Sequence, residues 1–282
     1  MTDDLPLIRR HFARAVRVAA TLPPSEATDR VSDAFAAVPR ERHAGSGPWR
    51  LIPESPAAEA WTTPNDDPRW LYTDALVALD EGAGINNGAP SMWARHLAML
   101  DIRPGTRVMQ VGAGGGYYTA ILAQLVGARG RVVAHEIEPH LAGRATRALE
   151  DVPNARVALG NGASDPDPGP HDLIVAFAGV THPVPAWIDA LAEGGRMLLP
   201  VTGARGWGAF VLFEREAPDR LALTTVDRCG FYPCAGARDD TLAERWDALL
   251  PGAQDRARMT MERRIAGSGE VALPGGWALR TV

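Results

Sequence analysis

The sequence predicts an α/β fold with a doubly wound, Rossmann-like sheet, a helical N-terminal segment before it and antiparallel strands at the sheet edge. From about residue 100 to residue 201, short apolar runs typical of strands alternate with helical segments. This alternation indicates crossover connections between parallel strands. A turn rich in glycine follows the first of these strands and opens a helix. The composition, 46% hydrophobic and 22% charged over 282 residues, is that of a globular chain.

Residues 1–70 are predicted to form two helices and a linker. Apolar residues recur at helical spacing near the N-terminus, and a second helix is expected over 26–38, ending before Pro39. The stretch 44–68 is expected to be a loop or tether outside the core, because breakers are spread through it. Its prolines are Pro48, Pro53, Pro56, Pro64 and Pro68.

The middle of the chain, 71–235, is expected to form the sheet domain. The predicted strands are 107–111, 131–135, 156–159, 172–177 and 196–201, and the predicted helices are 118–126, 141–150 and 185–192. Two further strands, 209–214 and 221–226, have no helix between them and are expected to be antiparallel. The tail, 236–282, is expected to be a helical extension, with apolar residues at helical spacing at Leu242, Trp246, Leu249 and Leu250.

Charge and cysteine content exclude several classes of function. The net charge is −5 and the chain contains no lysine, which argues against nucleic-acid binding, Schiff-base chemistry and a phosphate-binding P-loop. Two cysteines, Cys229 and Cys234, are too few for a disulfide scaffold or a structural zinc site, so we expect reduced thiols and assign no metal ligands. We see no signal peptide and no apolar run of the ~18 residues that a membrane span needs. We therefore expect a cytoplasmic protein without a membrane partner.

The glycine turn is the most informative motif. Val111 ends an apolar strand, and Gly112, Gly114 and Gly116 follow it at alternate positions. Glycine lets the backbone approach a ligand, and the helix that follows presents unpaired N–H groups. A dinucleotide fingerprint would have its third glycine where Tyr117 stands. The turn therefore favours a nucleoside without phosphates, S-adenosylmethionine, over a nicotinamide dinucleotide.

Two further positions fit the same cofactor. Glu136 ends the second strand, 24 residues after Gly112, where an acid can accept hydrogen bonds from both ribose hydroxyls. Glu138 is the competing acid, and His135 is expected to be an ordinary residue at the end of a strand. Asn161, followed by Gly162, can hydrogen-bond an adenine edge, although a simple Asn-Gly turn is the alternative.

Several motifs, in order and spacing, are similar to those of the protein-L-isoaspartate O-methyltransferases, between about Arg30 and Val201. They are Val38–Arg42, Tyr72 with Asp74, Gly84–Ala94, Val111–Ala120, Gly160–Gly162, Asp172–Val175 and Gly194–Val201. The resemblance implies a class I S-adenosylmethionine-dependent methyltransferase sheet. It also implies methylation of a carboxylate on a peptide or protein, above all an L-isoaspartyl residue in protein repair.

The resemblance places the acceptor at the segment from Ile85 to Ser91. Gly88 matches the position of the family's active-site serine, and Asn86 and Asn87 match its Thr-Ile pair. We take Asn87, Gly88 and Ser91 as candidate catalytic residues. The candidate substrate residues are Ile85, Asn86 and His182. The candidate cofactor-binding residues are Val111, Gly112, Gly114, Gly116, Tyr117, Glu136, Asn161 and Gly162. An Asn-Gly turn with a helix cap is the alternative for the first group. His182 is a base only if the acceptor is a hydroxyl, and an exposed loop histidine otherwise.

Two departures from the family pattern leave other functions open. Gly88 stands where the family has its serine, and Asn161 stands where the family's Gly-Asp-Gly has its acid. The insert between His43 and Tyr72 is also longer than is usual in the family. One alternative is a methyltransferase that acts on an aspartate of a biosynthetic peptide or on a small molecule. Another is a non-catalytic module that binds the cofactor.

Overall fold

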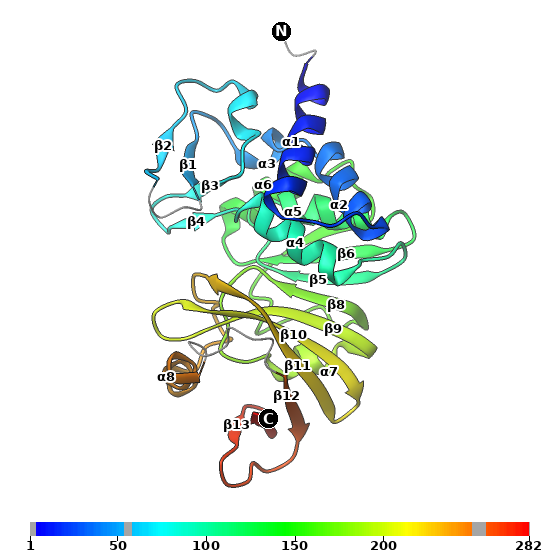
Figure 1. The fold of residues 1–282 in the computed structure, drawn as a ribbon, viewed down its shortest axis with the longest axis vertical. Coiled ribbons are helices and arrows are strands. Elements are labelled where there is room, and N and C mark those ends of the chain that lie inside the picture. Colours follow the sequence, from blue (N-terminus) through cyan, green and yellow to red (C-terminus); the bar gives the residue numbers. More distant parts are fainter. Residues whose placement is uncertain (1–3, 54–57, 250–257, 282) are drawn as a thin grey trace. The chain divides into compact units, whose positions relative to one another are not determined.

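The computed structural model describes residues 4–53, 58–249 and 258–281. Ten strands form one sheet, in the order β13-β14-β12-β11-β10-β9-β8-β5-β6-β7 (Figure 1). These strands are β5 (Arg107–Val111), β6 (Arg131–Glu136), β7 (Ala155–Leu159), β8 (His171–Ala176), β9 (Leu191–Thr202), β10 (Trp207–Ala217), β11 (Arg220–Gly230), β12 (Arg258–Arg263), β13 (Val271–Leu273) and β14 (Trp277–Thr281). β8 pairs in parallel with both β5 and β9, so the predicted parallel sheet is confirmed.

The helices follow the predicted alternation. They are α1 (Leu5–Ala19), α2 (Glu26–Ala37), α3 (Glu41–Ala44), α4 (Pro90–Leu100), α5 (Tyr117–Val126), α6 (Pro139–Ala148), α7 (Pro185–Asp189) and α8 (Asp240–Leu249). β5 is almost wholly buried, as expected of a central parallel strand whose residues after Arg107 are apolar except for Gln110. The α/β fold class is therefore confirmed.

The chain forms two compact units that interleave along the sequence. Unit 1 comprises 1–106, 113–132 and 138–158, and unit 2 comprises 107–112, 133–137 and 159–282. The chain passes from unit 2 to unit 1 inside the glycine turn, between Gly112 and Ala113. The division into 1–70, 71–235 and 236–282 thus stays a prediction.

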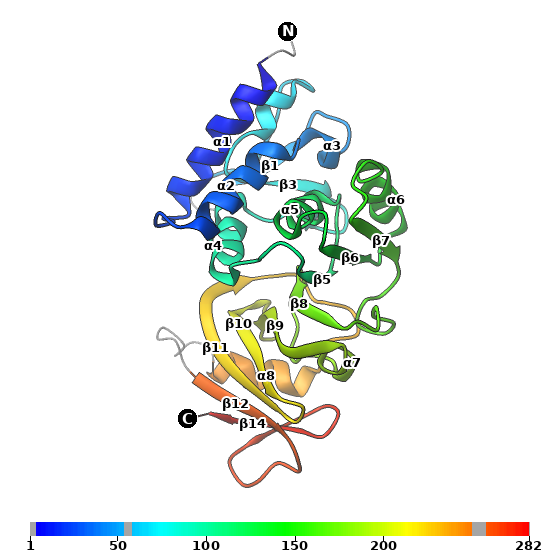
Figure 2. The same cartoon turned by 90° about the vertical axis from the view of Figure 1, so that its right-hand side faces the viewer.

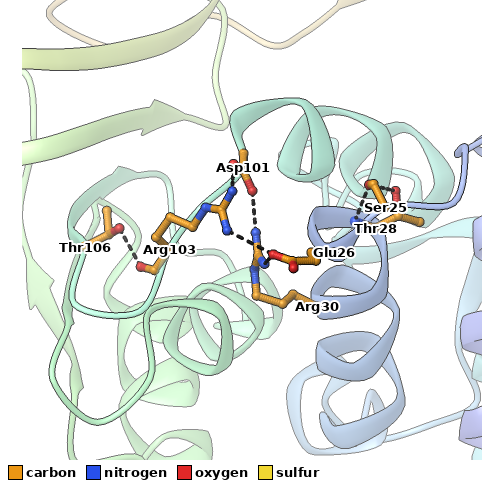
Figure 3. Close-up of polar contacts among 7 residues, drawn as sticks. All are labelled: Ser25, Glu26, Thr28, Arg30, Asp101, Arg103 and Thr106. Carbon is orange, nitrogen blue, oxygen red and sulfur yellow. Dashed lines mark hydrogen bonds and ion pairs between the residues drawn. The ribbon is translucent and has the colours of Figure 1, made fainter.

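Helices α1, α2 and α4 of unit 1 pack side by side (Figure 2). α2 begins where Ser25 caps its first turn by accepting from the Thr28 N–H. Asp101 follows α4 and has the left-handed conformation. Its carboxylate accepts hydrogen bonds from Arg30 of α2 and from Arg103 of the following turn (Figure 3). This exposed ion network joins the start of α2 to the end of α4.

The proline-rich stretch is not a tether, contrary to the prediction. It forms β1 (Arg50–Pro53) and β2 (Trp61–Thr62), followed by a 3₁₀ turn, η1 (Pro68–Leu71). β1 and β2 form a four-stranded sheet with β3 (Ala75–Asp80) and β4 (Ile85–Asn86), in the order β2-β1-β3-β4. Trp49, Leu51, Leu71 and Val77 are buried in its own small core. Prolines at the ends of short strands are compatible with this sheet. Pro56 lies outside the described residues.

Arg40 of the Val-Pro-Arg motif is fully buried in unit 1. Its guanidinium donates to the carbonyl oxygens of Leu71 at 2.6 Å, Thr73 at 2.7 Å and Ala75 at 2.6 Å. The planar fork of arginine can reach three acceptors at once, which the ammonium of lysine does less well. This one side chain therefore ties the end of η1 to the start of β3.

Unit 2 adds antiparallel strands to the sheet, as predicted, but they continue beyond the expected edge. β10 pairs with β9 and β11, and β11 pairs with β12. The tail is therefore not a helical extension: among its described residues, only α8 is a helix and β12–β14 are strands. The expected amphipathic helix is α8, with Leu242 and Trp246 buried. The Leu249 side chain and Leu250 lie outside the described residues.

No helix among the described residues is both long enough and apolar enough to cross a bilayer. Cys229 and Cys234 are free and buried, and burial raises the pKa of both thiols.

Candidate functional site

In unit 2 the carboxyl ends of three strands meet at the predicted site. The Gly112 N–H donates to the His135 carbonyl at 2.9 Å, and the Gly160 N–H donates to the Glu136 carbonyl at 2.9 Å. The Phe177 N–H donates to the Val111 carbonyl at 2.8 Å. The ends of β5, β6 and β8 and the turn after β7 are thus held together. Glu136 is buried there, with 6% of its surface exposed.

The turn after β7 is fixed by its own side chain and by its packing. Asn161 Oδ1 accepts from the Ala163 N–H at 2.9 Å, which is the simple turn considered above. Its Nδ2 group still carries N–H donors for a ligand. Gly162 has no room for a side chain, because a Cβ there would lie 2.8 Å from His135 Cβ.

In unit 1 the rest of the glycine turn needs glycine for two different reasons. Gly114 and Gly116 have φ of +55° and +83°, a left-handed conformation that other residues rarely adopt. Gly112, in unit 2, shares it with φ of +88°. Gly115 has no such φ but has no space: a Cβ would lie 2.1 Å from the His43 carbonyl oxygen. Sequence reasoning missed Gly115, although the run of three consecutive glycines was visible.

The Tyr117 side chain is buried and is not available to a cofactor, contrary to the prediction. The ring is 2% exposed and packs edge-on against Phe35 at 6.1 Å and beside Tyr118 at 5.1 Å. Its bulk is therefore accommodated among aromatic side chains of unit 1, and it does not by itself exclude a diphosphate. Only the backbone of Tyr117, at the start of α5, remains available to a ligand.

His43, in α3, contacts the glycine turn at Gly115. Its Nδ1–H donates to the Gly115 carbonyl at 2.9 Å, and burial lowers the pKa of its imidazole to about 4. The ring is therefore neutral at neutral pH, and it packs beside Tyr117 at 5.9 Å.

Acidification should destabilise the fold through His43. The unfolded imidazole binds a proton near its ordinary pKa of about 6.5, and the folded one only near 4, so stability is lost as pH falls through this window. We expect His43 to account for a loss of about 2–3 kcal/mol by pH 4. Urea unfolding at pH 7 and pH 4.5 measures it, and a His43→Asn variant should lose less between the two values. Equal losses in the variant and the parent would contradict this account.

The segment from Ile85 to Ser91 is locked into unit 1 by its own polar groups. Asn87 Oδ1 accepts from the Val77 N–H at 2.8 Å, and Asn86 Oδ1 accepts from the Gly88 N–H at 2.9 Å. The Ser91 N–H, at the start of α4, donates to Asp74 Oδ1 at 2.8 Å. Asp74, which sequence reasoning treated only as part of a motif, thus caps α4 from outside the helix. Ile85 is half-buried in β4.

Gly88 is required by the local geometry. Its φ is +75°, and a Cβ there would lie 2.6 Å from Trp93 Nε1, in a ring that is wholly buried. The Tyr118 hydroxyl donates to the Gly88 carbonyl at 3.3 Å. A serine in the family's manner therefore does not fit this loop.

Gly88→Ser should lower the free energy of unfolding by about 2–4 kcal/mol, from left-handed strain plus the displaced indole. Thermal or urea unfolding measures this loss. Gly82→Ser is the matched control in the same hairpin, since a Cβ there meets only Asp80 Oδ1 at 3.4 Å and no left-handed φ is involved. A fully stable Gly88→Ser protein would contradict the geometry.

His182 is not an exposed loop histidine, which was the alternative considered. It is buried in unit 2, and burial lowers the pKa of its imidazole. Its Nδ1 lies 2.9 Å from Thr181 Oγ1, and both residues line a small cavity whose other walls are apolar, among them Trp246 and Leu279. The histidine is therefore neutral at neutral pH.

The end of β6 fits a ligand with hydroxyl groups, because the buried Glu136 can accept hydrogen bonds from both hydroxyls of a ribose. The left-handed glycines leave the turn without side chains, as a ligand against the backbone requires.

Comparisons with known proteins identify the family of the chain. A family model described as protein-L-isoaspartate(D-aspartate) O-methyltransferase matches residues 24–239. The protein-L-isoaspartate O-methyltransferase of Methanopyrus kandleri is 30% identical over 240 residues, 84% of this chain and 96% of that one. That of Aeropyrum pernix is 37% identical over 182 residues, 62% of this chain and 69% of that one.

Two solved structures share the fold. A protein-L-isoaspartate O-methyltransferase superposes with a TM-score of 0.64 at 22% identity and covers 98% of this chain and 74% of that one. A Plasmodium falciparum protein named as a member of that family, in complex with S-adenosyl-L-homocysteine, gives 0.60 at 18% identity and covers 81% of this chain and 98% of that one. This chain belongs to the protein-L-isoaspartate(D-aspartate) O-methyltransferase family.

Proposed function

We propose that this chain is an S-adenosylmethionine-dependent O-methyltransferase that methylates the free carboxylate of L-isoaspartyl residues in peptides or proteins. The observation that carries the proposal is the turn of alternating left-handed glycines directly after β5, which lies inside the family match over 24–239.

Named residues have separate tasks in holding the cofactor. In unit 2, Glu136 would accept from ribose hydroxyls, and Asn161 and Gly162 would contact the base. In unit 1, the backbone of Gly114 and Gly116 at the start of α5 would face its amino-acid end. When bound, S-adenosylmethionine supplies an electrophilic methyl group.

The chain has little proton transfer to perform. A carboxylate acceptor is already ionised at neutral pH, so no general base is needed. The task left to the protein is to orient the acceptor and to exclude water. The locked segment Ile85–Ser91 suits the first part of this task, because its Asn86 and Asn87 side chains are fixed by hydrogen bonds. We place the acceptor on a polypeptide rather than on nucleic acid, given the net charge of −5.

The test is a methylation assay with mass-spectrometric detection, comparing an isoaspartyl peptide with the same peptide carrying normal aspartate. The proposal expects a methyl ester on the isoaspartyl peptide alone. Esterification of the normal aspartate, or of a small molecule only, would support the alternative substrates instead.

Calorimetry with S-adenosylhomocysteine and with NAD tests the cofactor. We expect the chain to bind S-adenosylhomocysteine and not NAD, and the reverse result would contradict the proposed cofactor.

Glu136→Ala should weaken S-adenosylhomocysteine binding by about 1.5–3 kcal/mol, roughly ten- to a hundredfold, because charged hydrogen bonds are lost. Isothermal titration calorimetry measures this. Glu138→Ala is the control, since that acid stands two residues later, at the N-cap of α6. Equal affinity in the Glu136 variant and the parent would show that the ribose lies elsewhere.

A further inference from the structure

Two exposed tryptophans lie at one end of the four-stranded sheet of unit 1. Trp61 on β2 is 39% exposed and Trp70 on η1 is 40% exposed. Their rings pack edge to face with centroids 5.8 Å apart. Large aromatic side chains held at the surface are typical of binding sites, since they combine apolar area with little side-chain freedom. We call Trp61 and Trp70 the tryptophan pair.

The tryptophan pair is held in place by a fixed loop. Asn65 Oδ1 accepts from Trp70 Nε1 at 2.9 Å and from the Asp67 N–H at 3.1 Å. The buried Thr63 hydroxyl donates to the Asn65 carbonyl at 2.8 Å and accepts from the Trp49 N–H at 2.9 Å. A surface fixed in this way loses little entropy when it binds.

Among the described residues, the pair also lies at the terminal strand of its sheet. β2 is the terminal strand of its sheet, and the Thr63 N–H points inward to the Trp49 carbonyl. Alternation along the strand therefore turns the backbone N–H and C=O of Thr62 outward. An exposed edge with aromatic side chains beside it suits an extended peptide that adds as a strand.

The charge around the pair selects the kind of peptide. Residues 58–70 contain three carboxylates and one guanidinium, and that guanidinium, Arg69, is paired with Asp67. Glu59 and Asp66 remain exposed on either side of Trp61 in the sequence. Exposed indoles in an acidic segment attract a lysine or arginine side chain, by cation–π and Coulomb interactions.

The same sheet carries the proposed acceptor segment. β1 pairs with β2 on one side and with β3 on the other, and β3 pairs with β4, which leads into Asn87 and Gly88. β2 and β4 are the opposite edges of this sheet, so a polypeptide bound at β2 would reach the acceptor loop through about five to six extended residues.

We propose that the tryptophan pair and the edge of β2 bind a lysine- or arginine-bearing extended segment of the methyl-accepting polypeptide. The inference rests on the proposed function and deepens it by naming a feature of the substrate outside the acceptor residue. The insert between His43 and Tyr72 then serves substrate selection.

The test compares two fluorescent isoaspartyl peptides, one with lysines about five to six residues to either side of the acceptor and one with glutamines at those positions. Binding to the full chain saturated with S-adenosylhomocysteine is followed by fluorescence anisotropy. Trp61→Ala and Trp70→Ala should each weaken binding of the lysine peptide by about five- to thirtyfold. Binding of the glutamine peptide should change much less. Trp207→Ala, at a 72% exposed tryptophan of unit 2, is the matched control and should change neither.

A charge variant tests the surface without touching the aromatic packing. Asp66→Asn should weaken the lysine peptide alone, and more so at low salt. In methylation assays the three variants should raise KM for the lysine peptide and leave kcat unchanged. The proposal would be overturned if the variants lost the same affinity for both peptides, or if no variant lost affinity for the lysine peptide. A dimer of the parent chain that Trp61→Ala dissociates would also overturn it. Anisotropy needs no turnover, so it still reports on the tryptophan pair if isoaspartyl peptides are not methylated.

Discussion

Arg40→Met should lower the free energy of unfolding by about 3–5 kcal/mol, because two buried carbonyl oxygens and one partly buried carbonyl oxygen lose their donor at once. The guanidinium now satisfies Leu71, Thr73 and Ala75, and it also lies over the Phe12 and Tyr117 rings at 5.6 Å and 5.7 Å. Methionine has similar length but no donor. Urea unfolding measures the loss, and β1–β4 should be the first part to lose protection in hydrogen exchange.

Arg42→Met is the matched control from the same motif. Arg42 is 37% exposed and pairs with Asp151, which is 59% exposed, at 2.8 Å and 3.0 Å. Solvent screening leaves such pairs worth about 0–1 kcal/mol. Similar losses in the two variants would mean that Arg40 acts through charge alone and not through its three carbonyl partners.

Gly115→Ala should cost about 3 kcal/mol of stability or more, since a methyl group would collide with backbone rather than with a movable side chain. The Cβ would lie 2.1 Å from the His43 carbonyl oxygen and 3.1 Å from its carbon. α3 would have to move, and with it the bond from His43 Nδ1 to the Gly115 carbonyl. Because Gly115 lies in the predicted cofactor turn, calorimetry should also show weaker S-adenosylhomocysteine binding.

Gly143→Ala separates the collision from a general effect of replacing glycine. Gly143 lies in α6, and a Cβ there meets only Arg147 Nη1 at 3.6 Å. Alanine in a helix should leave stability unchanged or raise it by up to about 1 kcal/mol. A Gly115→Ala protein as stable as this control would contradict the close approach of α3 to the turn.

The parallel part of the sheet could be predicted because its signals are local. Mainly apolar runs such as Val108–Val111 mark strands, and the glycines at 112, 114 and 116 mark left-handed turns, through preferences of the residues themselves. The position of Glu136 at the end of β6 followed from the same alternation. The candidate cofactor residues were therefore located from the sequence, and their role in binding a ligand stays a prediction.

The errors arose where the pattern was weaker or was misread. The proline-rich stretch became a sheet because Trp49 and Leu51 join Val77 of a later strand in one core. In the tail, alternation did signal strands, at Met259 with Met261 and at Val271 with Leu273. Each run is so short that the helical spacing of α8 dominated the interpretation.

Residue preferences were enough to predict the alternating strands and helices of 107–201, the left-handed glycine turn and the family resemblance, since these depend on residues close together in the chain. Three contacts became visible only in the folded chain: Arg40 with its three carbonyl oxygens, His43 with Gly115, and Asp74 with the start of α4. These contacts join residues between 17 and 72 positions apart. No local preference encodes such pairs, because they exist only once packing has brought the segments together.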